Sequence, residues 1–250
     1  MKSDQISLQL YTVREHTERD MPDTLRRVAG IGYPAVELAG FGGLHATDLR
    51  AVLDESGLRA SGAHVPLEDW NRDPGAVIAD MHAMGSSHAI IPFVAPEDRN
   101  EAFTRRLAED CNRWGELCRS EGITLSYHNH DFEFARMGET TMWEVLVAET
   151  DPALVHFELD LYWIKYGGAD PETVLRDVGD RVSLVHLKDM APDDTRSDLP
   201  VGEGTMPWPG LLETADEIGV EWYVAEQDNP RDAMEDVATS LRTMRNLSTE

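Results

Sequence analysis

Short apolar runs alternate with longer helical patterns along the whole chain of 250 residues. The runs are of strand length, and residues typical of helix starts and ends punctuate the segments between them, such as Pro22 in one first turn and Gly57 directly after another helix. The expected strands are residues 6–10, 35–38, 59–64, 88–93, 123–127, 155–159, 182–187 and 221–225, and the expected helices are residues 21–29, 47–55, 74–84, 100–121, 141–148, 171–178, 210–218 and 231–247. This alternation predicts an α/β protein with a parallel sheet.

Eight strand–helix units in a chain of this length match the size and periodicity of a closed barrel. A doubly wound sheet has the same alternation. Such a sheet commonly carries a glycine-rich phosphate turn after its first strand, where Tyr11-Thr-Val-Arg14 stands here. No linker, low-complexity segment or short repeat divides the sequence. We therefore predict a single (β/α)8 TIM barrel domain over residues 1–250.

Ionisable residues gather where the predicted strands end. In the clearest case, the fifth strand is followed at once by His128, Asn129, His130 and Asp131. The residues at six of the strand exits are Glu37, His64, His128, Asp160, His186 with Lys188, and Glu226. Because the carboxyl ends of all strands of such a barrel meet at one face, we expect these side chains to share the active-site end of the fold.

Four of these residues, His128, Asp160, His186 and Glu226, are predicted to bind one divalent metal ion. Two imidazoles and two carboxylates form a mixed nitrogen and oxygen shell, which suits Mn²⁺, Co²⁺, Zn²⁺ or Fe²⁺ better than Mg²⁺. Each residue also has an ordinary structural explanation. Asp160 could cap a helix, His186 could be a hydrogen-bonded core histidine, and Glu226 could pair with an arginine. Their joint occurrence at the exits of strands five to eight favours the metal site.

The charge balance limits the partners and surroundings of the protein. Asp and Glu number 47 against 22 Lys and Arg, which gives a formal net charge of −25 at pH 7. An acidic coat of this size repels itself unless salt screens it, and it is typical of a halophilic protein. It also disfavours a nucleic-acid partner, because binding to nucleic acid would need a basic surface.

The sequence shows no pattern of membrane insertion or secretion. No apolar run approaches the roughly 18 residues of a membrane span, and Met1 to Asp4 do not begin a signal peptide. Cys111 and Cys118 fall in one expected helix, where a disulfide between them does not suit the geometry. We therefore expect a cytoplasmic protein with reduced thiols and no membrane partner.

Several stretches carry a resemblance to a known family. They are Leu8-Gln-Leu-Tyr-Thr-Val13, Gly32-Tyr-Pro-Ala-Val-Glu37, Leu125-Ser-Tyr-His-Asn-His-Asp131, Glu158-Leu-Asp-Leu-Tyr-Trp163, Val185-His-Leu-Lys-Asp189, Val201-Gly-Glu-Gly-Thr-Met-Pro-Trp208 and Val224-Ala-Glu-Gln227. Together they resemble the xylose isomerase-like TIM barrel superfamily, and within it the sugar phosphate isomerase/epimerase group with its inosose dehydratase-like relatives. The resemblance implies a metal held by strands five to eight, commonly through Glu, Asp, His and Glu. Asp160, His186 and Glu226 match the last three, whereas His128 departs from the family's glutamate.

The same resemblance implies a divalent-metal-dependent isomerase or epimerase of a sugar, sugar phosphate or keto-sugar, which removes a proton next to a carbonyl and acts through an enediolate. Glu226 is the expected base, and Lys188, Glu158 or His64 is the expected second acid/base group. The alternative is a keto-sugar or inosose dehydratase or lyase, which would expel a β-hydroxyl or β-alkoxy group from the same site. The residues expected to contact the substrate are His64, Glu37, His130 and Trp163.

The same barrel could support two other functions. An apurinic endonuclease would need further metal-binding residues and a basic surface. A non-catalytic sugar-binding barrel would not need the trio Asp160, His186 and Glu226. The expected partner is a small-molecule sugar or keto-sugar, and the sequence leaves a homo-oligomer open.

Overall fold

Eight parallel strands close into a barrel in the computed structural model, which describes residues 1–249. Around the barrel they follow the order β1-β12-β9-β8-β5-β4-β3-β2. Their bounds are β1 Ile6–Gln9, β2 Ala35–Leu38, β3 Arg59–His64, β4 His88–Ile91, β5 Thr124–His128, β8 Val155–Asp160, β9 Val182–Leu187 and β12 Trp222–Ala225. These bounds agree closely with the strands expected from the sequence, and the predicted (β/α)8 TIM barrel is confirmed.

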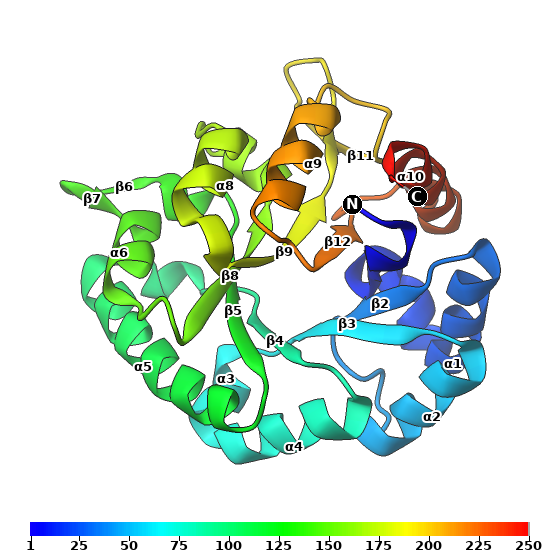
Figure 1. Cartoon of the computed structure of the whole chain (residues 1–250), viewed down its shortest axis with the longest axis horizontal. Helices are drawn as coiled ribbons and strands as arrows, with labels where there is room; N and C mark the ends of the chain where they lie inside the picture. The colour runs from blue at the N-terminus through cyan, green and yellow to red at the C-terminus, as the bar shows by residue number, and fades with distance from the viewer. Residues whose placement is uncertain (250) are drawn as a thin grey trace.

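A ring of helices surrounds the strands (Figure 1). These helices are α1 Arg14–Ile31, α2 Ala46–Ser56, α4 Pro74–Met84, α5 Glu101–Ser120, α6 Met142–Glu149, α8 Pro171–Val178, α9 Trp208–Glu217 and α10 Ala233–Leu247. Local sequence signals set their ends. At α4, the Asp73 side chain accepts a hydrogen bond from the Ala76 amide, and Gly85 ends the helix with a positive φ of 72°.

The first outer helix is longer than the sequence pattern indicated. It begins at Arg14 instead of Met21, and a kink at Asp20, whose φ of −161° is not helical, separates its two parts. Residues 14–19 are mostly polar, so they show no apolar periodicity in the sequence. Pro22 has no amide hydrogen to continue the bonding of the first part, which accounts for the break.

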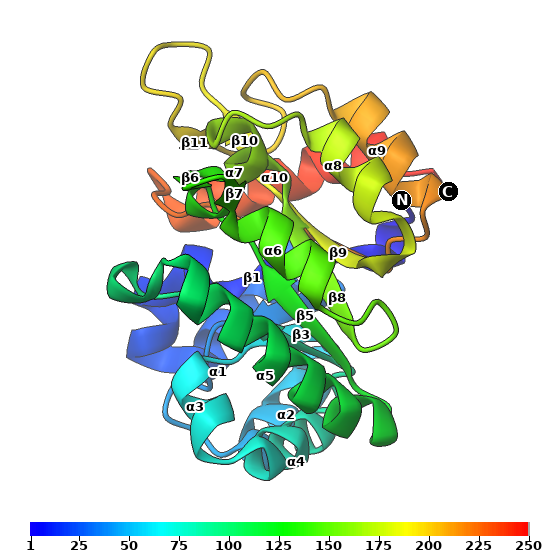
Figure 2. The same cartoon turned by 90° about the vertical axis from the view of Figure 1, so that its left-hand side faces the viewer.

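Short elements outside the eight units follow the strands directly. They are α3 Leu67–Arg72 after β3, the hairpin of β6 Arg136–Met137 and β7 Thr140–Thr141 after β5, α7 Leu161–Tyr166 after β8, and the hairpin of β10 Asp189–Met190 and β11 Asp198–Leu199 after β9. Figure 2 shows β10 and β11 in an excursion that stands out from the barrel. These elements therefore extend the carboxyl end of the barrel, where the predicted site residues lie.

The strand register brings the predicted site residues side by side. In the parallel pairing of β5 with β8, His128 lies opposite Glu158. In the pairing of β8 with β9, Asp160 lies opposite His186. β9 is buried at every position, as expected for a strand covered on both faces. The barrel scaffold alone thus places two pairs of ionisable side chains at one end of the sheet.

The structure also describes the two cysteines and the apolar character of the helices. Cys111 and Cys118 are free and buried on α5, as expected. In the described residues, no helix combines the length and the apolar character needed to cross a membrane.

We expect the melting temperature of the protein to rise between low salt and molar KCl. Ion pairs on the outer helices, such as that of Arg50 with Asp54, join exposed side chains, where water and salt screen the attraction. They cannot offset the repulsion within a net charge of −25, so screening ions should stabilise the folded state. Thermal unfolding followed by circular dichroism tests this, with a sucrose series as the control for solute exclusion from the surface. A melting temperature that stays flat or falls with KCl would contradict it.

Candidate metal centre

The four predicted metal ligands converge at the carboxyl end of the barrel. One donor atom from each of His128, Asp160, His186 and Glu226 lies within 4.8 Å of the others, and all four residues are buried. His128 and Asp160 end β5 and β8, His186 lies in β9, and Glu226 directly follows β12. The structure therefore brings together side chains from four separate strands, and their binding of an ion stays a prediction.

A second group overlaps the first and shares two of its histidines. It consists of His64, His128, Glu158 and His186, whose donor atoms also lie within 4.8 Å of one another. The Glu158 Oε2 atom lies 2.7 Å from His64 Nε2 and 2.9 Å from His128 Nδ1. The same oxygen lies 3.2 Å from His186 Nε2. Glu158 and His64, predicted as acid/base and substrate groups, are thus in direct contact with the candidate ligands.

Glu37 closes the inner side of this cluster. It is fully buried, and its Oε2 atom lies 2.7 Å from His186 Nε2 and 3.1 Å from His64 Nε2. Gln9 donates a hydrogen bond of 2.6 Å to the same oxygen. Burial alone would lower the pKa of His64, but the charges of Glu37 and Glu158 outweigh it and raise that pKa to about 9. The imidazolium charge of His64 therefore balances the carboxylates of Glu37 and Glu158 when no other cation is bound.

Lys188 is the counter-ion of three carboxylates, those of Asp160, Glu226 and Asp228. Its side chain is 1% exposed, and its Nζ atom lies 2.9 Å from Asp160 Oδ2, 2.8 Å from Glu226 Oε2 and 2.8 Å from Asp228 Oδ2. Burial opposes its charge, but the three carboxylates outweigh burial and raise the pKa of Lys188 well above its ordinary value. The ammonium group therefore stays charged, and its three donors face carboxylates.

Asp160 caps a helix, as one of its two sequence interpretations expected, and Glu226 pairs with Lys188 and His186 where an arginine was the expected structural partner. Asp160 Oδ1 accepts a hydrogen bond from the Trp163 amide and so caps α7, while its Oδ2 faces Lys188. Glu226 Oε2 lies 2.8 Å from His186 Nδ1 as well as close to Lys188. Burial would raise the pKa of Glu226, but the charges of Lys188 and His186 outweigh it, so this pKa lies below its ordinary value. Glu226 is therefore ionised at neutral pH.

The donor set fits a divalent cation. Among the described residues, the buried oxygen Glu158 Oε1 has no hydrogen-bond partner, and Glu158 belongs to the second group of candidate ligands. A buried carboxylate oxygen without a partner is costly, and a cation bound to it would satisfy it. Imidazole nitrogens mixed with carboxylate oxygens suit Mn²⁺, Co²⁺, Zn²⁺ or Fe²⁺.

A cavity of about 460 Å³ opens onto this cluster. The residues that line it are Tyr11, Ala39, Gly40, His64, Pro66, Pro92, Phe93, His128, His130, Glu226 and Asp228. Of the four predicted substrate contacts, His64 and His130 line the cavity, whereas Glu37 lies beneath it. The Trp163 ring does not line it either, but its centroid lies 5.9 Å from that of His130.

Sequence reasoning assigned no role to several residues that shape the site. Glu133 is fully buried, accepts a hydrogen bond of 2.8 Å from the Tyr127 hydroxyl and one of 2.7 Å from the His130 amide, and so fixes the loop after β5. Asp228 follows Glu226 by two residues at the exit of β12, a polar pattern that could have identified it. Tyr11 lies in the short 3-10 helix Leu10–Val13 after β1 and Phe93 in the loop after β4, and no spacing in the sequence connects them.

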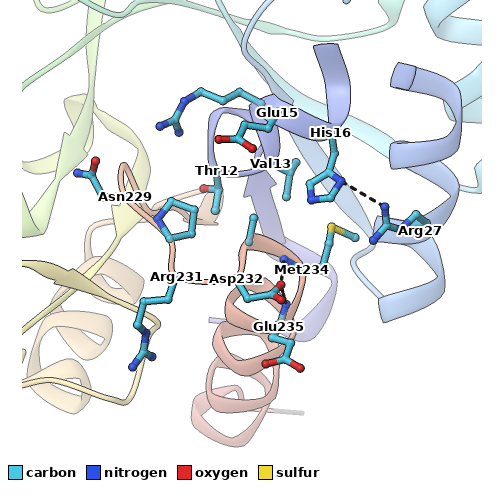
Figure 3. Close-up of a pocket in the computed structure, with 13 residues that line it drawn as sticks. Thr12, Val13, Glu15, His16, Arg27, Asn229, Arg231, Asp232, Met234 and Glu235 are labelled. Atoms are coloured by element: carbon cyan, nitrogen blue, oxygen red, sulfur yellow. Dashed lines mark hydrogen bonds between the residues drawn. The ribbon is translucent and has the colours of Figure 1, made fainter. Parts of the chain in front are cut away.

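A second hollow lies outside the candidate centre. It has a volume of about 670 Å³ and lies between the start of α1 and the loop that leads into α10. Figure 3 shows His16 and Arg27 in contact on one side of it and Asp232, the residue before α10, on another. The residues that line it, within the described chain, include none of the predicted metal ligands. It therefore belongs to the outer surface of the barrel end.

The chain is similar to proteins of one family. The sequence profile of the xylose isomerase-like TIM barrel family matches residues 25–247. A curated relative, an inosose dehydratase from Geobacillus kaustophilus, is 27% identical over 202 residues, which cover 72% of this chain and 64% of the relative. The chain thus spans less than two thirds of that relative's length.

Solved structures of related proteins share the fold. A sugar phosphate isomerase/epimerase from Parabacteroides distasonis is 27% identical, with a TM-score of 0.84 over 98% of this chain and 94% of the other. A probable 3-DHS dehydratase from Bacillus anthracis is 13% identical, with a TM-score of 0.71 over 98% of each chain. The likeness at 13% identity shows the fold alone.

Proposed function

The chain belongs to the xylose isomerase-like TIM barrel family, and we propose that it is a divalent-metal-dependent enzyme that isomerises or epimerises a sugar through an enediolate. The observation that carries this proposal is the buried convergence of His128, Asp160, His186 and Glu226 beside a cavity of about 460 Å³. A volume of roughly 300–1,000 Å³ is typical of small-molecule sites. The proposed substrate is a small sugar or keto-sugar, with no nucleic-acid partner.

The residues around the cavity have the properties that proton abstraction needs. Glu226 lines the cavity and is ionised, as a base for the carbon next to the substrate's carbonyl must be, although the contacts that lower its pKa also weaken it as a base. Lys188 and His186 hold its carboxylate in place through contacts of 2.8 Å each. A bound divalent cation would supply the positive charge that stabilises negative charge developing on the substrate.

The placement of the carboxylates bears on the type of reaction. Glu158 is fully buried and lies among imidazoles, whereas Glu226 and Asp228 are the carboxylates that line the cavity within the described chain. Glu226 and Asp228 both follow β12 and both contact Lys188 Nζ at 2.8 Å, so they lie together on one side of the cavity, which favours isomerisation over epimerisation by two opposing carboxylates. Isomerisation needs Glu226 to remove the proton and return it to the neighbouring carbon, and a second group, Lys188, Glu158 or His64, to move the hydroxyl proton to the carbonyl oxygen.

A second candidate is a keto-sugar or inosose dehydratase on the same site. The curated relative from Geobacillus kaustophilus bears the name inosose dehydratase, and this likeness at 27% identity favours the candidate. The chemistry begins with the same loss of a proton to Glu226 and ends with the departure of a hydroxyl group from the next carbon. Both candidates therefore share one first step and differ in their products.

The shared step can be measured directly. Protein freed of metal with EDTA and reloaded with Mn²⁺ is incubated in D₂O and molar KCl with a panel of ketoses and inososes. We expect deuterium to enter one of these substrates at the carbon next to its carbonyl, only with metal present. An isomer as product supports the isomerase, and a product lacking one water supports the dehydratase. Metal-loaded protein that exchanges no proton on any member of the panel would contradict the proposal.

A further inference from the structure

Two exposed aromatic side chains flank the cavity above the candidate metal centre. Tyr11 is 42% exposed and Phe93 is 45% exposed, and both line the cavity. Within the described residues, Leu117 is the other large hydrophobic side chain with comparable exposure, at 46%, and it lies on α5 away from the cavity lining. Exposed aromatic rings gathered at a concave site indicate a binding surface for apolar material.

The cavity lining contains both polar and apolar side chains. Its imidazole and carboxylate side chains include the candidate ligands His128 and Glu226. The apolar residues among its lining are Tyr11, Ala39, Pro66, Pro92 and Phe93. A bare sugar carries hydroxyl groups on nearly every carbon, so it would match the polar side chains well and leave most of the apolar ones without a matching group.

The cavity lining also lacks the cations that a phosphate needs. No lysine or arginine is among the described residues that line it, whereas the carboxylates of Glu226 and Asp228 are. Lys188 lies nearby, but its three donors face carboxylates. A dianionic phosphate would meet negative charge here without the guanidinium or ammonium partner that such groups usually bind.

Two arginines lie beside the rim aromatics and are absent from the cavity lining. The Arg14 guanidinium lies 4.2 Å from the centroid of the Tyr11 ring and donates to the Asp228 carbonyl, and Arg14 lines the outer hollow instead. The Arg99 guanidinium lies 3.5 Å from the centroid of Phe132 and 4.9 Å from that of Phe93. Both rim rings are thus within cation–π range of an arginine that does not line the cavity.

We infer that the substrate is an uncharged sugar that carries an apolar substituent, an aryl or alkyl ether, and that Tyr11 and Phe93 bind this substituent while the sugar faces the metal cluster. The inference rests on the proposed function for the placement of the sugar. It names unphosphorylated sugar ethers as the substrate class, in contrast to the sugar phosphates that the name of the Parabacteroides distasonis relative indicates for that protein.

Calorimetric titration of the Mn²⁺-loaded protein in molar KCl tests the inference with three stable probes, namely D-glucose, phenyl β-D-glucopyranoside and D-glucose 6-phosphate. We expect the phenyl glucoside to bind about tenfold more tightly than glucose, since stacking and burial of one ring supply about this factor. We expect the phosphate to bind no more tightly than glucose. Tyr11→Ala and Phe93→Ala should each remove most of the phenyl advantage, measured as the ratio of the two affinities, phenyl glucoside to glucose, of the same variant.

Leu117→Ala is the matched control, because it removes an equally exposed apolar side chain from α5 and should leave all three affinities unchanged. Tighter binding of glucose 6-phosphate than of the phenyl glucoside would overturn the inference, as would an unchanged phenyl advantage in both rim variants. The inference and the proposed function can fail independently of each other. Metal-dependent proton exchange confined to phosphorylated sugars would overturn the inference alone, whereas a retained phenyl preference without exchange on any sugar would overturn the function alone.

Discussion

Replacing Glu226 with glutamine should lower turnover by roughly 10²–10⁴-fold, the factor that a positioned acid/base group supplies. The amide keeps the shape of the side chain and one oxygen donor but cannot accept the substrate's proton. His186 and Lys188, which contact the carboxylate at 2.8 Å each, hold the side chain in place. We therefore expect Glu226→Gln to retain much of the bound metal while proton exchange in D₂O falls with turnover.

The matched comparison is Asp228→Asn. Asp228 lines the same cavity and contacts Lys188 at the same distance of 2.8 Å, but it lies outside both groups of candidate ligands. Its substitution removes an equal charge and should cost far less activity. Metal content measured by atomic emission, together with steady-state rates, separates the two variants. Near wild-type turnover in Glu226→Gln, or an equal loss in Asp228→Asn, would remove Glu226 from the role of base.

Much of this site could be predicted from the sequence because a parallel barrel has one active-site end. Once residues 124–128 and 155–160 are recognised as strands, their last residues His128 and Asp160 must lie at that end, and the structure places them there. The alternation of side chains along a strand also places Glu158 on the same side as Asp160. Strand exits are thus the part of such a fold that local patterns describe best.

The remaining features depend on distances across the barrel, which no local pattern contains. Glu37 and His186 are 149 positions apart, and their contact of 2.7 Å depends on the closure of the whole sheet. Lys188 was expected as a second acid/base group, and this stays a prediction. Its Nζ contacts Asp160, Glu226 and Asp228, which come from two different strand exits. The rim residues Tyr11 and Phe93 follow β1 and β4, and such connecting segments carry no periodic signal.

Lys188→Met should destabilise the metal-free protein by roughly 3–5 kcal/mol, which is the cost of removing one partner from a buried ion pair. The substitution leaves Asp160, Glu226 and Asp228 close together without the ammonium that contacts each of them at 2.8–2.9 Å. Denaturant unfolding in molar KCl with EDTA measures this loss. Lys165→Met is the matched control, because it removes the same charge from a side chain whose Nζ reaches only the Thr205 carbonyl, at 3.4 Å, among the described residues. A Lys188→Met protein as stable as this control would contradict the assigned role.

Metal binding should change the stability of Lys188→Met in the opposite direction. A divalent cation beside Asp160 and Glu226 would replace part of the lost positive charge, so Mn²⁺ should raise the stability of Lys188→Met by more than it raises that of the wild type.

The products formed by Lys188→Met distinguish dehydration from isomerisation. If Lys188 protonates a leaving group, formation of the dehydrated product should collapse while proton exchange in D₂O persists. If exchange and turnover fall together, Lys188 acts by holding Glu226 and the developing charge in place, and isomerisation is favoured. Wild-type rates in stable, metal-loaded Lys188→Met would exclude Lys188 from both chemistries.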